Sequence, residues 1–185
     1  VRGHRDNVGS NNHSTINGGA YVDEKFGGWD DVVLEAGYLM RFPNDDRKAA
    51  TFTLLDGPRF EPKTVPWQEF GTRHPTLSKF RDGWDIPGQN PFWTGKDFMY
   101  YRYADVLLMY AEAATMAEGS PSNEAYQAIN DVRLRAHGTN LTPGLDQIAF
   151  RDAVIEEVAW EFGGEQRRWF DLTRTEKVEW ANDLS

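Results

Sequence analysis

The chain has 185 residues, 39% of them hydrophobic and 26% charged, which is enough for one globular domain with a buried core. A formal net charge of -9 and the lack of any Lys/Arg cluster exclude nucleic acid as an expected partner, because acidic surfaces repel phosphate. The absence of cysteine excludes disulfides and thiolate metal sites, and the sequence contains no apolar run of about 18 residues that would span a membrane.

Residues 1–101 form a loop-rich, aromatic region without a sustained helical period. Twelve of the 17 glycines and seven of the nine prolines precede Tyr101, where they separate short apolar runs. Glycine and proline at this density interrupt regular structure. We therefore expect loops with short strands in this half of the chain.

Residues 102–185 change to apolar spacings of three and four, which predict helices. The first helix is expected over Arg102–Ala117 and is predicted to be heavily buried through one stripe: Tyr103, Val106, Leu107, Tyr110, Ala114 and Ala117. Gly119 should end it. A second helix is expected over Ser122–Ala136, after a cap at Ser120 and a proline at 121. Its predicted core face consists of Ala125, Ala128, Ile129, Val132 and Ala136.

A second pair of helices is predicted over Asp146–Phe162 and Glu165–Lys177, separated by Gly163-Gly164. The core face of the third helix is predicted to be Phe150, Val154, Ile155, Val158, Ala159 and Phe162, and the fourth helix should fold back on the third. Two hairpins of about 34 residues match the period of tetratricopeptide repeats. The expected fold is mainly α, with tetratricopeptide-like helical hairpins packed against a loop-rich region with short strands.

Three strings in the helical half resemble the SusD/RagB family of nutrient-binding outer-membrane lipoproteins. Arg102–Ala113 reads RYADVLLMYAEA, like the family signature, and Ala128–Ala136 is similar to the family's "IN.VR.RAG". Glu157–Arg174 is similar to "ER..EL..EG.R..DL.R". This last string departs from the pattern at Val158, where the family usually has Arg, and at Gln166, where it usually has Gly.

The resemblance implies that the chain is the C-terminal part of a larger single domain, in which 1–101 and 102–185 are two regions. It implies a non-enzymatic, cofactor-free protein at the outer-membrane surface, attached through an N-terminal lipid outside these residues. Such a protein would capture oligosaccharide or peptide and deliver it to a TonB-dependent SusC-like transporter. Two alternatives stay open from the residues alone: a tetratricopeptide-type protein-binding adaptor and a secreted glycan hydrolase.

The charged residues of the motifs are expected to be structural. Glu157, Glu161 and Glu165 are four apart, but the two glycines interrupt the helix between the last two, so the spacing gives no acid/base pair for glycoside hydrolysis. Buried charges need partners. We expect the motif charges Arg102, Asp105, Arg168 and Asp171 to be paired at the helical layer. The four histidines are dispersed and predict no metal site or catalytic triad.

Tryptophans in the loop-rich half are the candidate ligand-binding residues. Aromatic faces stack on sugar rings while neighbouring polar groups bind hydroxyls, and loops are where binding groups concentrate. The same rings would also suit partner contacts, or would pin the loops onto the helices. The candidates, each beside polar residues, are Trp67, Trp84, Trp93 and Trp29. Trp160 and Trp169, in helical segments, are expected to pack.

Overall fold

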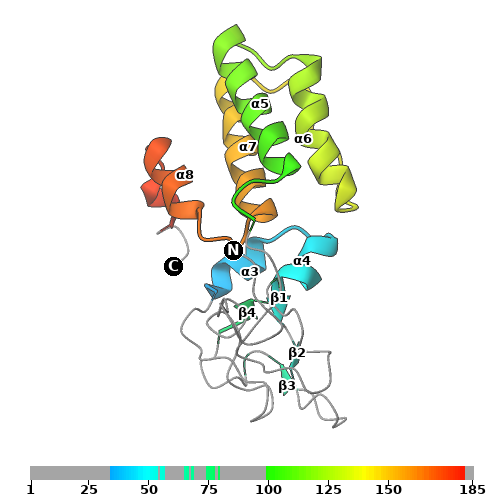
Figure 1. Cartoon of the computed structure of the whole chain (residues 1–185), viewed down its shortest axis with the longest axis vertical. Helices are drawn as coiled ribbons and strands as arrows, with labels where there is room; N and C mark the ends of the chain where they lie inside the picture. The colour runs from blue at the N-terminus through cyan, green and yellow to red at the C-terminus, as the bar shows by residue number, and fades with distance from the viewer. Residues whose placement is uncertain are drawn as a thin grey trace, which may run out of the picture. The chain divides into compact units, whose positions relative to one another are not determined.

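The computed structural model describes residues 34–53, 55–56, 65–66, 68, 74–77, 79 and 99–181. The chain forms two compact units, one of Val1–Arg41 and Lys48–Met99 and the other of Phe42–Arg47 and Tyr100–Ser185. In chain order (Figure 1) the described elements are α3 (Ala36–Arg41), α4 (Asp46–Thr51), β1 (Phe52–Thr53), β2 (Leu55–Asp56), β3 (Val65–Pro66), β4 (Thr76–Leu77), α5 (Tyr103–Glu118), α6 (Asn123–Arg135), α7 (Gln147–Glu161), α8 (Arg168–Arg174) and the 3-10 turn η2 (Val178–Ala181). The mainly helical fold with short strands is confirmed.

The first unit contains two minimal antiparallel strand pairs, β1 with β4 and β2 with β3. Phe52 of β1 lies opposite Leu77 of β4, and both side chains are buried. The Tyr38 ring of α3 lies 5.7 Å from the Phe52 ring. Paired strands of two residues cannot stabilise themselves, so these apolar contacts hold the described part of this unit together.

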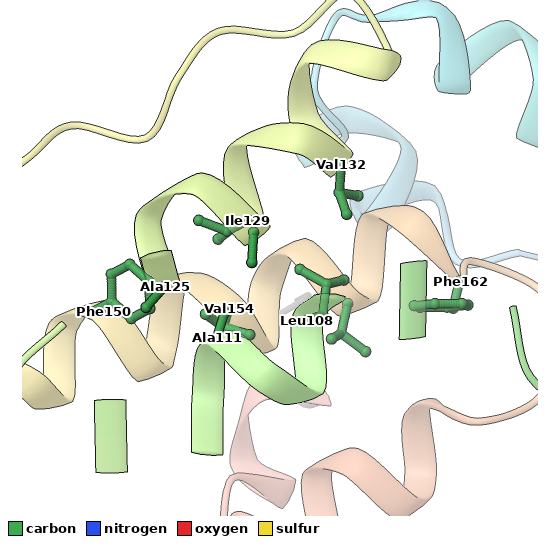
Figure 2. Packing of buried hydrophobic residues seen from close by; sticks show 10 residues of the cluster. Leu108, Ala111, Ala125, Ile129, Val132, Phe150, Val154 and Phe162 are labelled. Carbon is green, nitrogen blue, oxygen red and sulfur yellow. The ribbon is translucent and has the colours of Figure 1, made fainter. Parts of the chain in front are cut away.

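The second unit is built around α5, α6 and α7, with α5 packed against both of the others. Figure 2 shows the core between them, in which side chains from all three helices meet. Its buried members are Leu108 and Ala111 of α5, Ala125, Ala128, Ile129 and Val132 of α6, and Phe150, Val154, Val158 and Phe162 beside or within α7. The predicted core face of α6 is confirmed, and so is that of α7 apart from Ala159, which is only partly buried. Val158, at the position where the family usually has arginine, is one of these core residues.

The helix ends follow from local chemistry. Asp146 caps α7 by accepting a hydrogen bond from Ala149 N at 2.8 Å, as predicted. The cap of α6 is Ser122 rather than Ser120: its hydroxyl accepts from Ala125 N at 3.2 Å. The prediction was two residues early because either serine satisfies the pattern. Gly119 ends α5 with φ of 79°, a left-handed conformation that disfavours side chains.

The predicted stripe of α5 is not its buried face. Tyr103, Val106 and Tyr110 are 73%, 52% and 48% exposed, whereas Leu108 and Ala111 are buried. This prediction was wrong because α5 carries apolar residues almost all the way round, so its periodicity does not determine which side α6 and α7 cover.

The fourth helix is shorter than predicted. After Phe162 the chain turns through Gly164 and Gln166, which both have positive φ, so α8 begins only at Arg168. The closest helical neighbour of α7 is α5 rather than α8. The chain after α7 still returns along it, because Arg168 Nη1 donates to Ile155 O at 3.0 Å and Lys177 Nζ to Asp152 Oδ2 at 3.0 Å.

Replacing Leu108 by Ala should lower the free energy of unfolding by about 2–5 kcal/mol, because it opens a cavity among buried side chains. The matched change Val106→Ala on the exposed face of the same helix should cost less than about 0.5 kcal/mol. Urea denaturation of both variants measures the difference. Equal costs would contradict the assigned difference in burial, and a larger cost for Val106→Ala would show that α5 is buried on the other side.

Gln166 has φ of 59°, a conformation that costs side-chain-bearing residues about 1–2 kcal/mol. Gln166→Gly should therefore raise the free energy of unfolding by about 0.5–1 kcal/mol, since glycine offsets part of the gain through its entropy. Gly164→Ala, at φ of 79° in the same turn, should lower it by about 1 kcal/mol. Thermal melts of the pair check both signs, and a destabilised Gln166→Gly chain would contradict the prediction.

Candidate functional site

The four candidate ligand-binding residues, Trp29, Trp67, Trp84 and Trp93, lie outside the described residues. Their role stays a prediction. The structure does describe the charged residues of the family-like motifs, and it brings them together at one end of the helical layer.

Two carboxylates of α7 are the centre of this arrangement. Glu157 is fully buried, and its two oxygens accept hydrogen bonds from two arginines: Arg47 Nη1 at 2.6 Å and Arg133 Nη1 at 2.8 Å. Arg133 comes from the last turn of α6. A carboxylate without exposure to water is costly unless it is paired in this way. The two guanidinium groups therefore make its burial possible.

Glu161, one turn further along α7, is 2% exposed and contacts three arginines. Arg135 Nη2 lies 2.7 Å and 2.8 Å from its two oxygens, Arg47 Nη1 lies 3.2 Å from Oε2, and Arg102 Nη1 donates to Oε1. Burial by itself would raise the pKa of Glu161, but the hydrogen bond from Arg102 and the charges of Arg102, Arg135 and Arg47 outweigh it and lower the pKa. Glu161 is therefore held ionised.

Arg102 ties the start of α5 to the end of α7. Its Nη2 donates to Glu161 O at 2.8 Å and to Glu165 Oε1 at 3.0 Å. Burial opposes the charged form, but the hydrogen bonds from Arg102 to Glu161 and Glu165 raise its pKa. Its guanidinium carbon also lies 4.1 Å from the centre of the Phe162 ring. The two glycines between Glu161 and Glu165 thus do not separate these carboxylates, since one arginine binds both.

Arg47 and Asp45 are the members of this cluster that the sequence did not reveal. Arg47 reaches Glu157 across 110 positions, and its Nη2 lies 2.6 Å from Asp45 Oδ2. Asp46 N donates to Ala136 O at 3.2 Å, which fixes this segment against the end of α6. The only available signal was the similarity of Asp46-Arg47 to a family "DPR" string, which does not indicate a partner.

A second charged cluster lies beside α8. Arg167 contacts Asp105 of α5 and lies 3.5 Å from Asp171, which in turn lies 3.2 Å from Arg174. Arg174 binds both oxygens of Glu112 at 2.8 Å and 2.9 Å. With the contacts of Arg102 already described, the predicted pairing of charges is confirmed for Arg102, Asp105 and Asp171. For Arg168 the hydrogen bond described is to the backbone carbonyl of Ile155.

This arrangement of charges suits structure better than acid/base chemistry. A general acid needs a raised carboxyl pKa, whereas the pKa of Glu161 is lowered. Among the described residues, no group of three or more His, Asp or Glu side chains is arranged to hold a metal ion. Nor is any helix in the described ranges long and apolar enough to cross a membrane.

The two tryptophans of the helical segments behave differently. Trp160 is buried, with its ring 5.3 Å from that of Phe42, as predicted. Trp169 is 60% exposed and its neighbour Phe170 is 69% exposed, so the prediction that Trp169 packs is wrong for this chain. Trp169 and Phe170 lie in the first turn of the short α8, whose buried side is occupied by Asp171 and Leu172.

Comparison with known proteins supports one assignment. The model of the SusD family matches residues 60–183. SusD-like protein P25 of Formosa agariphila is 33% identical over 156 residues, which are 82% of this chain and 27% of that protein. Surface glycan-binding protein A from Bacteroides uniformis has a TM-score of 0.69 at 27% identity, covering 92% of this chain and 36% of its own. A SusD superfamily protein from Parabacteroides distasonis reaches 0.73 at 21% identity, covering 94% and 38%.

Glu161→Gln should lower the free energy of unfolding at pH 7 by about 3–5 kcal/mol, because it removes a buried negative charge that Arg47, Arg102 and Arg135 share. The lowered pKa of Glu161 means that its stabilisation is present above the ordinary carboxyl value of 4.5 and is lost as the pH falls through the folded value. The difference in the free energy of unfolding between variant and parent should therefore become smaller at acid pH.

The matched control is Glu156→Gln, an exposed position on the same helix, which should change stability by less than about 0.5 kcal/mol at any pH. Urea unfolding at a series of pH values measures both. If the loss of stability in Glu161→Gln does not change with pH, Glu161 is not an ionised carboxylate held by arginines.

Proposed function

Because the chain belongs to the SusD family, we propose that it is part of a protein that binds carbohydrate at the cell surface. The observation that carries the proposal is the family match together with the 27% identity to a surface glycan-binding protein over most of this chain. The chain spans about a quarter to two fifths of its relatives' lengths, so the proposal concerns the longer protein to which they correspond.

We assign recognition to the loop-rich half. Trp67, Trp84 and Trp93 are bounded by glycine and proline and lie beside Asp, Asn, Gln or Arg, and Trp29 is a fourth candidate. A ring held in a short loop loses little conformational freedom on binding, and adjacent amides and carboxylates can bond sugar hydroxyls. This setting supports stacking on an oligosaccharide. A peptide is the alternative ligand, since the same aromatics also suit protein contacts.

The helical unit supports the binding region without performing chemistry. Its buried carboxylates Glu157 and Glu161 contact two and three arginines, and Glu161 has a lowered pKa. The lowered pKa makes Glu161 unsuited to donate a proton to a glycosidic oxygen, a step that requires a raised pKa. We therefore propose binding without turnover.

Delivery completes the proposal. We propose that the whole protein is anchored by an N-terminal lipid at the outer-membrane surface and passes its ligand to a SusC-like TonB-dependent transporter. A lipid chain together with a partner contact gives stable attachment where a single chain gives marginal binding. The acidic sequence, at a formal -9, is consistent with an extracellular surface that avoids nucleic acid.

Replacing Trp67, Trp84 or Trp93 singly by Ala in the complete gene product should weaken binding of its polysaccharide ligand about 5- to 150-fold for at least one position, since loss of a stacking aromatic costs roughly 1–3 kcal/mol. Affinity electrophoresis against a panel of soluble polysaccharides identifies the ligand, and titration calorimetry measures each variant. A melting curve for each variant excludes unfolding as the cause.

Trp169→Ala is the matched control, because this ring is 60% exposed but lies on α8 rather than in the loops. It should leave affinity unchanged. Normal binding by all three loop variants would assign recognition to another part of the protein. Release of new reducing ends from the bound polysaccharide would reject the non-enzymatic assignment.

A further inference from the structure

The segment Phe42–Arg47 belongs to the helical unit, although the residues on both sides of it belong to the first unit. We call this segment the clip. Helix α3 ends at Arg41, directly before the clip, and α4 begins within the clip at Asp46 and continues to Thr51. The chain therefore enters the clip from one helix and leaves it along another, so a change in the position of the clip is passed directly to both helices.

Two anchors fasten the clip to the helical unit, one aromatic and one ionic. Phe42 is 3% exposed, and its ring packs edge to face on that of Trp160. At the other end of the clip, Arg47 is 8% exposed and binds Glu157 and Glu161. Between the two anchors the clip backbone donates a hydrogen bond of 3.2 Å to the end of α6. An apolar and a charged anchor together fix both ends of the segment.

The helices on either side of the clip lead back to one segment of the first unit. Before α3, Leu34 N donates to Pro75 O at 3.0 Å, at the residue that precedes β4. After α4, Phe52 of β1 lies opposite Leu77 of β4. The chain thus leaves residues 75–77, docks on the helical unit through the clip, and returns to the same residues.

The short elements beside the clip need support from outside themselves. β1 and β4 have two residues each, and α3 and α4 have six. Strands of two residues do not sustain their own pairing, and helices of six residues are too short to persist without packing. The clip adds buried contacts on α7, a helix of 15 residues, to the apolar contacts of Phe52 and Leu77.

We propose that the clip is a positioning element: by docking Phe42 and Arg47 on α7, it keeps α3, α4, β1 and β4 in the conformation in which the loop-rich half binds its ligand. Affinity then depends on the fraction of molecules in which the clip is docked. The coupling is reciprocal, so bound ligand stabilises the docked clip. The effect on affinity rests on the proposed carbohydrate binding, whereas the ordering of the short elements does not.

Arg47→Met tests the proposal, because it removes the ionic anchor but leaves Glu157 its second arginine, Arg133, and Glu161 its other two. Asp45, whose side chain is 3% exposed, loses the hydrogen bonds of the guanidinium group, and its buried charge then favours the undocked clip. Arg133→Met is the matched control. It takes an arginine from the same carboxylate but leaves both anchors of the clip intact.

Amide hydrogen exchange of the complete gene product, read by peptide mass spectrometry, measures the order of β1 and β4. Exchange in these strands should be about tenfold faster in Arg47→Met and unchanged in Arg133→Met. Titration calorimetry with the soluble polysaccharide that the parent retains in affinity electrophoresis should show about tenfold weaker binding by Arg47→Met only. Both measurements are made at a temperature at which circular dichroism shows every variant to be folded.

A covalent link across the clip separates loss of docking from loss of the arginine itself. Asp46 Oδ2 and His137 Nδ1 lie 2.6 Å apart, on side chains that are 69% and 79% exposed. Asp46→Cys and His137→Cys are combined with Arg47→Met, and the two thiols are joined by a short bis-methanethiosulfonate reagent. The link should restore slow exchange and parental affinity, and cleavage of its disulfides by dithiothreitol should abolish both again.

Unchanged exchange in Arg47→Met would overturn the proposal, and so would a link that restores neither exchange nor affinity. Equal effects of Arg47→Met and Arg133→Met would also overturn it, since they would reflect a general loss of stability. Faster exchange with unchanged affinity would reject the positioning role in binding. If the parent binds no polysaccharide, the proposed function fails, and hydrogen exchange alone decides whether the clip orders β1 and β4.

Discussion

The burial of two carboxylates on α7 is the constraint on which the helical unit depends. Glu157 and Glu161 lie one turn apart and are almost fully buried. Their arginines come from three separate places: Arg47 in the first turn of α4, Arg102 at the start of α5, and Arg133 and Arg135 at the end of α6. With Asp45 and Glu165 the cluster contains four acidic and four basic groups. Such a cluster adds little net stability over an apolar core, but it penalises every arrangement in which one arginine is misplaced. It therefore fixes the register of the helices.

The sequence correctly predicted those features of the helical unit that depend on local chemistry. The core faces of α6 and α7 were predicted from apolar residues three and four apart, and Asp146 marks a helix start through its own side chain. The family-like strings also indicated that Arg102 and Asp171 would be paired. The sequence did not indicate which apolar side of α5 is covered, or which arginines bind Glu157, because in each case several residues fit the pattern equally well. One of these arginines, Arg47, is 110 positions away from Glu157. The candidate tryptophans remain predictions from their sequence setting.

Charge and apolar surface are distributed in an unusual way around α5. Asp105 is buried on the covered side, while tyrosine, valine and methionine face outwards. In a self-contained domain the reverse is expected, because exposed apolar area gains nothing from folding. The misassigned stripe and the exposed Trp169 and Phe170 belong to the same pattern.

This distribution also bears on where function can reside. The arginines and carboxylates of the cluster neutralise one another. The lowered pKa of Glu161 keeps this carboxylate ionised near neutral pH, so it has no proton to donate there. Charged groups that are already paired with one another are poorly placed for proton transfer to a substrate. The role proposed for the loop-rich half agrees with this, because loops tolerate changes of side chain that a packed helical core does not.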